Sequence, residues 1–187
     1  MTRQKLLAVI LILTALVSFQ GCGHRGGDPL EYRNAPFAAE IDGEICPNVG
    51  VRVSFSAELE LFERGEGEYR GFRLVFRSPD ALAGLSVCRA ADGSVTVACD
   101  GLEQALPSGD FVDGFIKIAE TLDPAEDILR VSSVSGDSIG LDGVPYLTLI
   151  ETSSHKIYLD INSSYPVRAE FSGGELRVSI SGISPRT

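Results

Sequence analysis

The sequence has no tryptophan, one methionine and two histidines, and aromatic residues make up 7% of its 187 positions. Sugar-binding surfaces rely on exposed aromatic rings, so the composition does not support a carbohydrate platform. Paired carboxylates of the kind that hydrolyse glycosides occur in any acidic chain, but no spacing here singles out one pair. Internal repeats are also lacking, and the composition fits a single folded domain.

The chain has four cysteines, and Cys22 follows a possible export signal. The other three are an odd number. Cys46, Cys88 and Cys99 leave at least one thiol without an intramolecular partner. Cys88 and Cys99 flank the turn signal at residues 91–94, and a two-residue hairpin loop would project them from the same face. A disulfide and buried free thiols both fit this pattern. The spacings offer too few ligands for a metal site, so we predict no metal and no cofactor.

Positive charge is scarce, because 16 lysines and arginines face 26 acidic residues. Residues 1–21 carry two of the basic residues and no acidic one, so the remainder has 14 basic and 26 acidic residues and a formal charge of −12. An acidic body repels phosphate backbones and anionic lipid headgroups. We therefore predict no nucleic-acid partner, and attachment to a membrane would have to come from a lipid anchor.

The only long hydrophobic run extends from Leu6 to Val17 and follows two basic residues. A positive start and an apolar run too short to span a bilayer comfortably are typical of a secretory signal. The run leads into Gly21-Cys22, which resembles the end of a bacterial lipoprotein signal, although Phe19 and Gln20 stand where that signal prefers leucine and a small residue. In such signals the cysteine is acylated, for example with palmitate, and becomes the new N-terminus. Plain secretion and a retained membrane anchor are the alternatives.

This signal divides the chain into three predicted segments. Residues 1–21 form the signal peptide, residues 22–36 form a lipidated cysteine and a flexible tether rich in glycine and proline, and residues 37–187 form the folded domain. The tether reaches at most about 50 Å when fully extended. The remaining chain of about 166 residues is long enough to bury a core of its own. We therefore expect one extracytoplasmic domain, anchored to the cell membrane by Cys22.

From Phe37 onward, apolar residues alternate with polar ones in steps of two. The longest alternating run covers residues 49–61, and residues 37–45 show the same pattern. Shorter runs occupy residues 72–76, 85–99, 144–150, 157–161, 167–171 and 176–180. This alternation is typical of antiparallel strands with one apolar and one solvated face, and the short polar links between the runs indicate hairpins.

Helical periodicity is confined to the middle of the chain. Phe111, Phe115, Ala119 and Leu122 fall on one stripe of a helix over residues 110–122. Residues 123–126 then have the features of a helix start, with aspartate as N-cap, proline at the first position and glutamate completing a capping box. We expect the second helix to be short and to end near Arg130.

The balance of strands and helices predicts the architecture. Roughly ten strands of ordinary length expose more apolar surface than two short helices can cover. The sheet must therefore curl on itself, which predicts a mainly β fold with short helices (α+β): a strongly curved antiparallel sheet, or unclosed β-barrel, with a helical lid. A two-sheet sandwich is the alternative.

The order of these features resembles the LolA/LolB-like lipoprotein carriers. The resemblance combines the export signal, the tether, the alternating strands, the strand-to-proline transition at residues 76–82, the hairpin at Asp92-Gly93, the central helices and the late strand that follows Tyr165. It covers about residues 37–183 and includes clostridial-type lipoproteins, some of which are adaptors in spore germination. It implies an unclosed, curved sheet whose concave apolar side is plugged by helices.

The resemblance implies two functions that the sequence does not separate. In the first, an acyl chain or a lipidated protein binds in the apolar cavity, where each buried CH₂ contributes about 0.8 kcal/mol. The residues expected to line that cavity are Phe55, Leu59, Phe72, Leu74, Phe76, Phe111 and Phe115. In the second, the same fold serves as a non-enzymatic adaptor for a cell-envelope protein such as a cell-wall amidase.

Enzyme motifs occur only as fragments. Residues 136–140 match G-x-S-x-G, and Ser138 with His155 and Asp142 or Asp160 would make a triad on paper. That motif requires a strand, a turn and a helix in an α/β sheet, whereas Ser138 lies among predicted hairpins. We therefore predict that the protein is not an enzyme.

Overall fold

A computed structural model describes residues 30–48, 51–65, 69–107, 110–123, 127–171 and 173–186, without the side chains at 47–48 and 110–112. The predicted signal peptide, Cys22 and the tether up to residue 29 lie outside these ranges. Among the described residues, no helix is long and apolar enough to cross a membrane.

Eleven strands, two short 3-10 turns and one α-helix make up the described fold. In chain order they are η1 (Glu31–Asn34), β1 (Phe37–Asn48), β2 (Val51–Leu61), β3 (Phe72–Ser78), β4 (Ser86–Arg89), β5 (Val95–Cys99), β6 (Leu102–Leu106), α2 (Asp110–Glu120), β7 (Arg130–Val134), η2 (Asp137–Ile139), β8 (Leu147–Glu151), β9 (His155–Asp160), β10 (Pro166–Phe171) and β11 (Leu176–Pro185).

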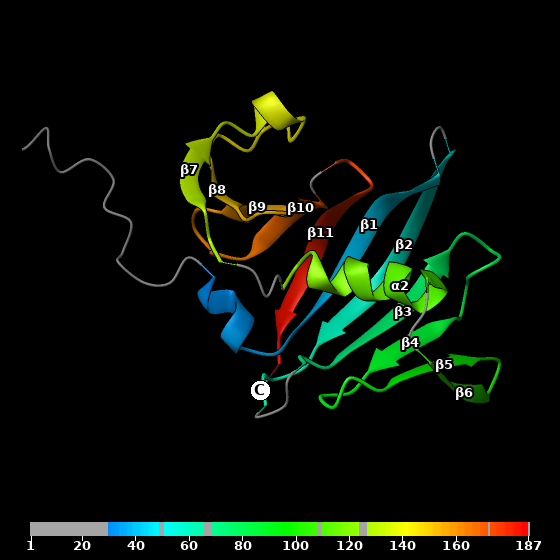
Figure 1. The fold of residues 1–187 in the computed structure, drawn as a ribbon. Helices are drawn as coiled ribbons and strands as arrows, with labels where there is room; N and C mark the ends of the chain where they lie inside the picture. Colours follow the sequence, from blue (N-terminus) through cyan, green and yellow to red (C-terminus); the bar gives the residue numbers. More distant parts are fainter. Residues whose placement is uncertain are drawn as a thin grey trace, which may run out of the picture.

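The strands form one antiparallel sheet from two meanders that meet at its centre. The sheet order is β6-β5-β4-β3-β2-β1-β11-β10-β9-β8-β7, so the first and last strands of the chain lie side by side (Figure 1). In that central pair Ile41 lies opposite Ile180 and Gly43 opposite Val178. Strands β6 and β7 are the two free edges, which means that the sheet is not closed. The segment that joins the two meanders contains α2.

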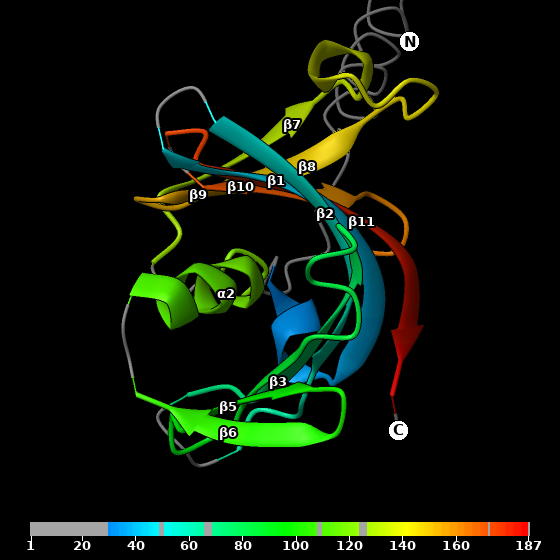
Figure 2. The ribbon, with the colours of Figure 1, turned by 90° about the vertical axis from the view of Figure 1, so that its right-hand side faces the viewer.

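The sheet is strongly curved, and α2 and η1 lie in its hollow (Figure 2). Every strand except β7 contributes apolar side chains to this concave side, where they pack against Phe115, Ile118, Ala119 and Leu122 of α2 and its C-terminal turn. The most deeply buried side chains of this core include Phe37, Ile41, Leu59, Leu61, Phe72, Leu74, Val87, Leu122, Ile150 and Ile157. The predicted curved sheet is therefore confirmed, and the sandwich is wrong.

A second, smaller cluster covers the opposite face of the β7–β10 arm. Leu147, Leu149 and Tyr158 form its buried centre, and partly buried side chains from the loop that carries η2 pack against them. Arg168 anchors this loop by donating a hydrogen bond to the carbonyl oxygen of Ile139. This arm of the sheet is consequently covered on both faces.

The predicted lid is smaller than expected. Helix α2 forms where the apolar stripe predicted it, but the second helix does not extend to Arg130: residues 127–129 are not helical, and Arg130 begins β7. Residues 124–126, where the capping signals predict a helix start, lie outside the described residues. From Arg130 onward the chain pairs with β8 instead, with Arg130 opposite Glu151 and Val134 opposite Leu147. Only one α-helix is therefore found in the described part of the chain.

The predicted flexible tether also ends earlier than its assigned boundary at residue 36. Leu30 is fully buried, Tyr32 is buried, and the Tyr32 hydroxyl donates to the carbonyl oxygen of Leu122 at 2.7 Å. The buried Arg70 guanidinium donates to the carbonyl oxygen of Ala35 at 2.7 Å. Glycine and proline content predicted flexibility, whereas these two apolar side chains add η1 to the folded domain.

Cys46, Cys88 and Cys99 are free thiols. The β4–β5 hairpin forms as predicted, but Arg89 lies opposite Val95, so its loop is longer than two residues. Cys88 lies opposite Thr96, three positions from Cys99, and side chains three positions apart point to opposite faces of a sheet. The two thiols cannot meet across this hairpin. Burial raises the pKa of the Cys88 thiol, which keeps it protonated.

Candidate functional site

A cleft of about 740 Å³ opens on the concave side, between α2 and one end of the central strands. Most of its lining is apolar and comes from β1, β2, β3, α2, β10 and β11 together with the turn after β3. We call it the concave cleft; its apolar lining residues are Ile45, Val53, Phe55, Phe76, Leu82, Phe115, Ile118, Phe171 and Leu176.

Three phenylalanines join the sheet to the helix in this cleft. The rings of Phe55 and Phe76 lie edge to face with centroids 5.8 Å apart, and Phe76 makes the same contact with Phe115 of α2 at 5.3 Å. Such pairs add to the burial energy and hold ring orientations. Phe55 also lies against Gly43, its direct partner on β1, where a Cβ atom would stand 2.3 Å from Phe55 Cζ. The glycine makes room for the aromatic row.

The C-terminal end of α2 is fixed by a buried ion pair. Arg70 donates through Nε to the carbonyl oxygen of Phe62 at 2.8 Å, and its Nη1 lies 3.6 Å from Oδ2 of the buried Asp123. Burial lowers the pKa of Arg70, and the facing Asp123 opposes that shift. Arg64 approaches the same carboxylate at 3.2 Å. These contacts hold the chain directly after α2 to the loop between β2 and β3.

A second arginine ties the helix itself to β4. Nη1 of Arg89 donates to the Glu120 carboxylate at 2.8 Å, and its Nε donates to the carbonyl oxygen of Arg70 at 3.2 Å. Its guanidinium also lies over the rings of Tyr69 and Phe72, at 5.5 and 5.1 Å from their centroids. All of these polar anchors lie at the C-terminal end of α2, whereas the concave cleft lies beside residues 113–118.

Charged side chains surround the mouth of the concave cleft. Asp113, Lys117 and Glu175 are exposed, and Cys46 is half-buried beside them. The Lys117 ammonium lies 5.5 Å from the ring centroid of Phe171, which is one of the lining residues. An apolar interior with a charged rim can bury a hydrocarbon chain while a polar end group stays in water.

The structure places the predicted cavity residues at two depths. Phe55, Phe76 and Phe115 line the concave cleft. Leu59, Phe72 and Leu74 point to the same side of the sheet but are fully buried in the core, away from the cleft. The side chain of Phe111 lies outside the described residues.

Sequence reasoning missed other lining residues, chiefly Ile45 of β1, Phe171 of β10 and Leu176 of β11. Their alternation marks them as inward-facing, but their position next to Phe55 depends on the pairing of the first and last strands. That pairing joins residues more than a hundred positions apart, and no local signal reports it.

Ser138 and Asp160, two residues of the possible catalytic triad, stabilise local turns instead. The Ser138 hydroxyl donates to the carbonyl oxygen of Ser135 at 2.6 Å, and the Asp160 carboxylate accepts from the backbone N–H of Asn162 and Ser163. His155 is buried at the start of β9, with its ring edge to face against Phe171 at 5.1 Å. Among the described residues, no group of three metal-ligating side chains is found.

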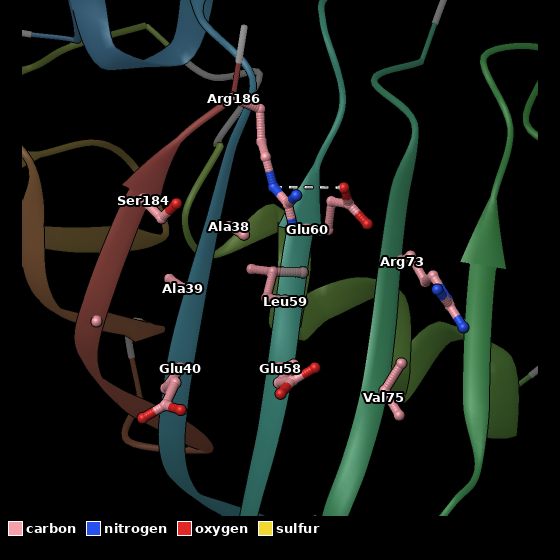
Figure 3. A pocket seen from close by; sticks show the side chains of 11 residues that line it. Ala38, Ala39, Glu40, Glu58, Leu59, Glu60, Arg73, Val75, Ser184 and Arg186 are labelled. Carbon is pink, nitrogen blue, oxygen red and sulfur yellow. Dashed lines mark ion pairs between the residues drawn. The ribbon is translucent and has the colours of Figure 1, made fainter.

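Two hollows on the convex face have a different character. The first, of about 230 Å³, lies over β11, β1, β2 and β3 and includes an ion pair between Arg186 and Glu60 at 3.8 Å (Figure 3). The second, of about 540 Å³, is lined mainly by serines, arginines and acidic residues: Asp42, Glu44, Ser54, Ser56, Ser78, Arg168, Arg177 and Ser179. Both linings carry more polar than apolar surface, so neither hollow suits a hydrocarbon as well as the concave cleft does.

No family model and no curated protein matches the chain. Among solved structures, an uncharacterized conserved protein from Thermus thermophilus is similar with a TM-score of 0.50 and 13% identity, over 86% of this chain and 85% of that one. A putative outer membrane lipoprotein-sorting protein domain from Vibrio parahaemolyticus gives 0.43 at 9% identity, over 84% and 89%. A LolA superfamily protein from Nitrosomonas europaea gives 0.40 at 12% identity, over 82% and 87%.

The similarity to the Thermus protein concerns the fold alone. The architecture is the one that the sequence resemblance implied: an unclosed, curved antiparallel sheet with a helix on its concave side.

Proposed function

We propose that this protein is a membrane-tethered, extracytoplasmic lipoprotein that binds an acyl chain, free or attached to a protein, in the concave cleft. The observation that carries the proposal is the cleft itself, about 740 Å³ in volume and lined mainly by aliphatic and aromatic side chains. Such a lining offers a hydrocarbon a dry surface, while the charged groups stay at the rim, which supports a role in binding.

The expected affinity follows from the number of methylene groups buried. Ten buried CH₂ groups contribute roughly 8 kcal/mol. Loss of rotational and translational freedom, together with any movement of α2, reduces this gain. We therefore expect dissociation constants weaker than about 1 µM. Affinity should rise with chain length until the cleft is filled.

The location of the protein is part of the proposal. Acylation of Cys22 would hold the domain within reach of the outer surface of the cell membrane, because the tether up to residue 29 is short. A domain held in this way cannot carry a lipid between two membranes. It would instead receive or present an acyl chain at the surface to which it is anchored.

Uptake of fluorescent palmitate by the purified full chain tests the function. We expect saturable binding, and we expect Val53→Glu to weaken it at least tenfold because a carboxylate would enter the apolar lining. The matched control is Val51→Glu, since Val51 is exposed on the same strand and is not a lining residue. An absence of saturable uptake, or equal effects of the two substitutions, would overturn the proposal.

A second function is favoured by an exposed apolar pair. Tyr146 is 61% exposed and Ile161 is 51% exposed; Tyr146 directly precedes Leu147 and Ile161 directly follows Asp160, which pair at the same end of β8 and β9. Exposed apolar groups of this kind are typical of protein-binding surfaces. An adaptor for a cell-envelope protein such as a cell-wall amidase would use this pair. In that case Ile161→Asp would abolish binding of the amidase, whereas Val53→Glu would leave it unchanged.

A further inference from the structure

Strand β6 forms an open edge of the sheet. Among the described strands it pairs only with β5, and it lies at the rim of the curved sheet in Figure 2. Leu102, its first residue, is 79% exposed. Edge strands are normally blunted by lysine, proline or a bulge. Between Leu102 and Leu106, β6 has none of these, and its single charged residue is Glu103.

The turn before β6 determines which backbone groups face outward. Asp100 and Gly101 both have positive φ angles, 52° and 81°, as in a two-residue type I′ hairpin. Such a turn is closed by a hydrogen-bonded pair, here Cys99 and Leu102. Because the pattern alternates, Gln104 directs its N–H and C=O groups toward β5, whereas Glu103 and Ala105 direct theirs toward the free edge.

We propose that β6 pairs with β6 of a second copy of this chain, antiparallel and about a two-fold axis that passes next to Gln104. In this register Glu103 lies opposite Ala105 of the partner subunit, and the outward groups of these residues form four backbone hydrogen bonds. Leu102 lies opposite Leu106 of the partner subunit, and this pair occurs twice.

The sequence of β6 is self-complementary under this operation. Each exposed Leu102 finds an apolar side chain, each Glu103 faces an alanine, and no like charges stand directly opposite each other. Pro107 follows the strand and limits the pairing to these five residues. Two-fold pairing of the other edge strand, β7, with its own copy would be less complementary. It would place Val131 opposite Ser133 and Arg130 opposite Val134.

The pairing should be weak and sensitive to conditions. Five residues a side bury less surface than the roughly 1,200 Å² of a stable protein complex, so we expect dissociation constants in the micromolar range or weaker. Each copy carries a formal charge of −10, and added salt should screen the repulsion.

A cysteine on the two-fold axis tests the register. In the full chain with Cys22, Cys46, Cys88 and Cys99 replaced by serine, Gln104→Cys would face its own copy as a non-hydrogen-bonded pair. The Cα atoms of such a pair lie about 4.5 Å apart, within the range that a disulfide spans. Under mild oxidation we expect a covalent dimer to form at least tenfold faster than with Glu103→Cys, which is off the axis, or Ser132→Cys, at the centre of β7. Equal rates for the three variants would overturn the proposal.

Sedimentation of the unmodified chain provides the second test. We expect a concentration-dependent dimer that salt strengthens, and we expect Ala105→Pro to remain monomeric. The Ala105 N–H points away from β5, so this substitution leaves the pairing within the sheet intact, and an unchanged thermal unfolding midpoint would show that the variant is folded. An unmodified chain that stays monomeric at every concentration, or a folded Ala105→Pro variant that dimerises equally well, would contradict the proposal.

Discussion

Gly43 shapes the floor of the concave cleft. It faces Phe55 across the β1–β2 pair, and the phenylalanine ring occupies the space that a side chain on β1 would need. From that position Phe55 meets Phe76, which in turn meets Phe115 of the helix. A residue without a side chain thus sets the orientation of an aromatic row that reaches α2.

We expect Gly43→Ala to lower the free energy of unfolding by about 1–3 kcal/mol, because its Cβ would force Phe55 away from its place. Urea denaturation measures this change. Gly114→Ala is the matched control: no atom lies within 4 Å of a Cβ built there, and alanine is the better helix former, so we expect a gain of about 0.5–1 kcal/mol. Changes of the same sign in both variants would contradict the packing argument.

Asp160 illustrates a pH effect at a single turn. Backbone N–H donation by Ser163 at 2.7 Å, with a smaller contribution from Asn162 at 3.0 Å, holds the pKa of Asp160 below its usual value. The resulting stabilisation is fully present above the unfolded pKa of about 3.9 and is lost as the pH falls through the lower, folded pKa.

We therefore expect Asp160→Asn to unfold at a lower temperature than the unmodified chain at pH 7, and the two melting temperatures to converge as the pH is lowered below about 4. Thermal unfolding monitored by circular dichroism across this range provides the measurement. A difference that widens as the pH falls would show that the carboxylate is not stabilised by the turn.

At the scale of elements, helix α2 is held unequally at its two ends. Arg70 and Arg89 tie its C-terminal side to the sheet, through a buried contact with Asp123 and a half-buried contact with Glu120. Beside residues 113–118 the helix instead meets the aromatic row and the open concave cleft. A ligand entering the cleft would therefore displace the N-terminal half of α2 more easily than the C-terminal half.

Replacing Arg70 should destabilise the packing of the C-terminal end of α2 against the sheet. We expect Arg70→Met to lower the free energy of unfolding by about 3 kcal/mol, since two carbonyl oxygens lose a donor and the buried Asp123 keeps only the more exposed Arg64. Arg77→Met is the control: Arg77 also pairs with two carboxylates, Glu40 and Glu58, but on the exposed convex face. Calorimetry that finds equal losses for both variants would refute the anchor.

The elements also show what local sequence can reveal. Alternation predicted the strands because every second side chain of a half-buried strand is apolar. The apolar stripe over residues 110–122 predicted α2 because one face of that helix is buried. The predicted second helix does not reach Arg130, because residues 130–134 pair with β8. Leu30 and Tyr32 were assigned to the tether because their burial depends on contacts with distant residues such as Leu122.

For the whole molecule, curvature separates two kinds of surface. The convex face of the central strands carries serines and opposed charges, whereas the concave face carries the core and the cleft. Phe55, Leu59, Phe72, Leu74 and Phe76 lie on the concave face because alternation along a strand assigns each side chain to a face. Which of them border the open space depends on the pairing of β1 with β11, a contact that only the complete fold defines.

The proposed attachment of the protein to the membrane can be tested by replacing Cys22. We expect Cys22→Ala to abolish incorporation of labelled palmitate and to shift the protein out of the membrane fraction of its host cell. Quantitative fractionation gives the measurement, and Cys99→Ala, which alters an exposed thiol of the folded domain, is the control. Membrane attachment and palmitate incorporation that persist in Cys22→Ala would mean that this residue is not the anchor.

The position of a bound acyl chain is the central claim, and Cys46 reports on it directly. This thiol lies at the rim of the concave cleft, whereas Cys99 lies outside it, at the end of β5. The measurement is the rate of maleimide labelling of each thiol with and without palmitate. Our account predicts that palmitate slows the labelling of Cys46 several-fold and leaves that of Cys99 unchanged. An unchanged rate at Cys46 under conditions where palmitate is bound, or equal slowing at both thiols, would contradict it.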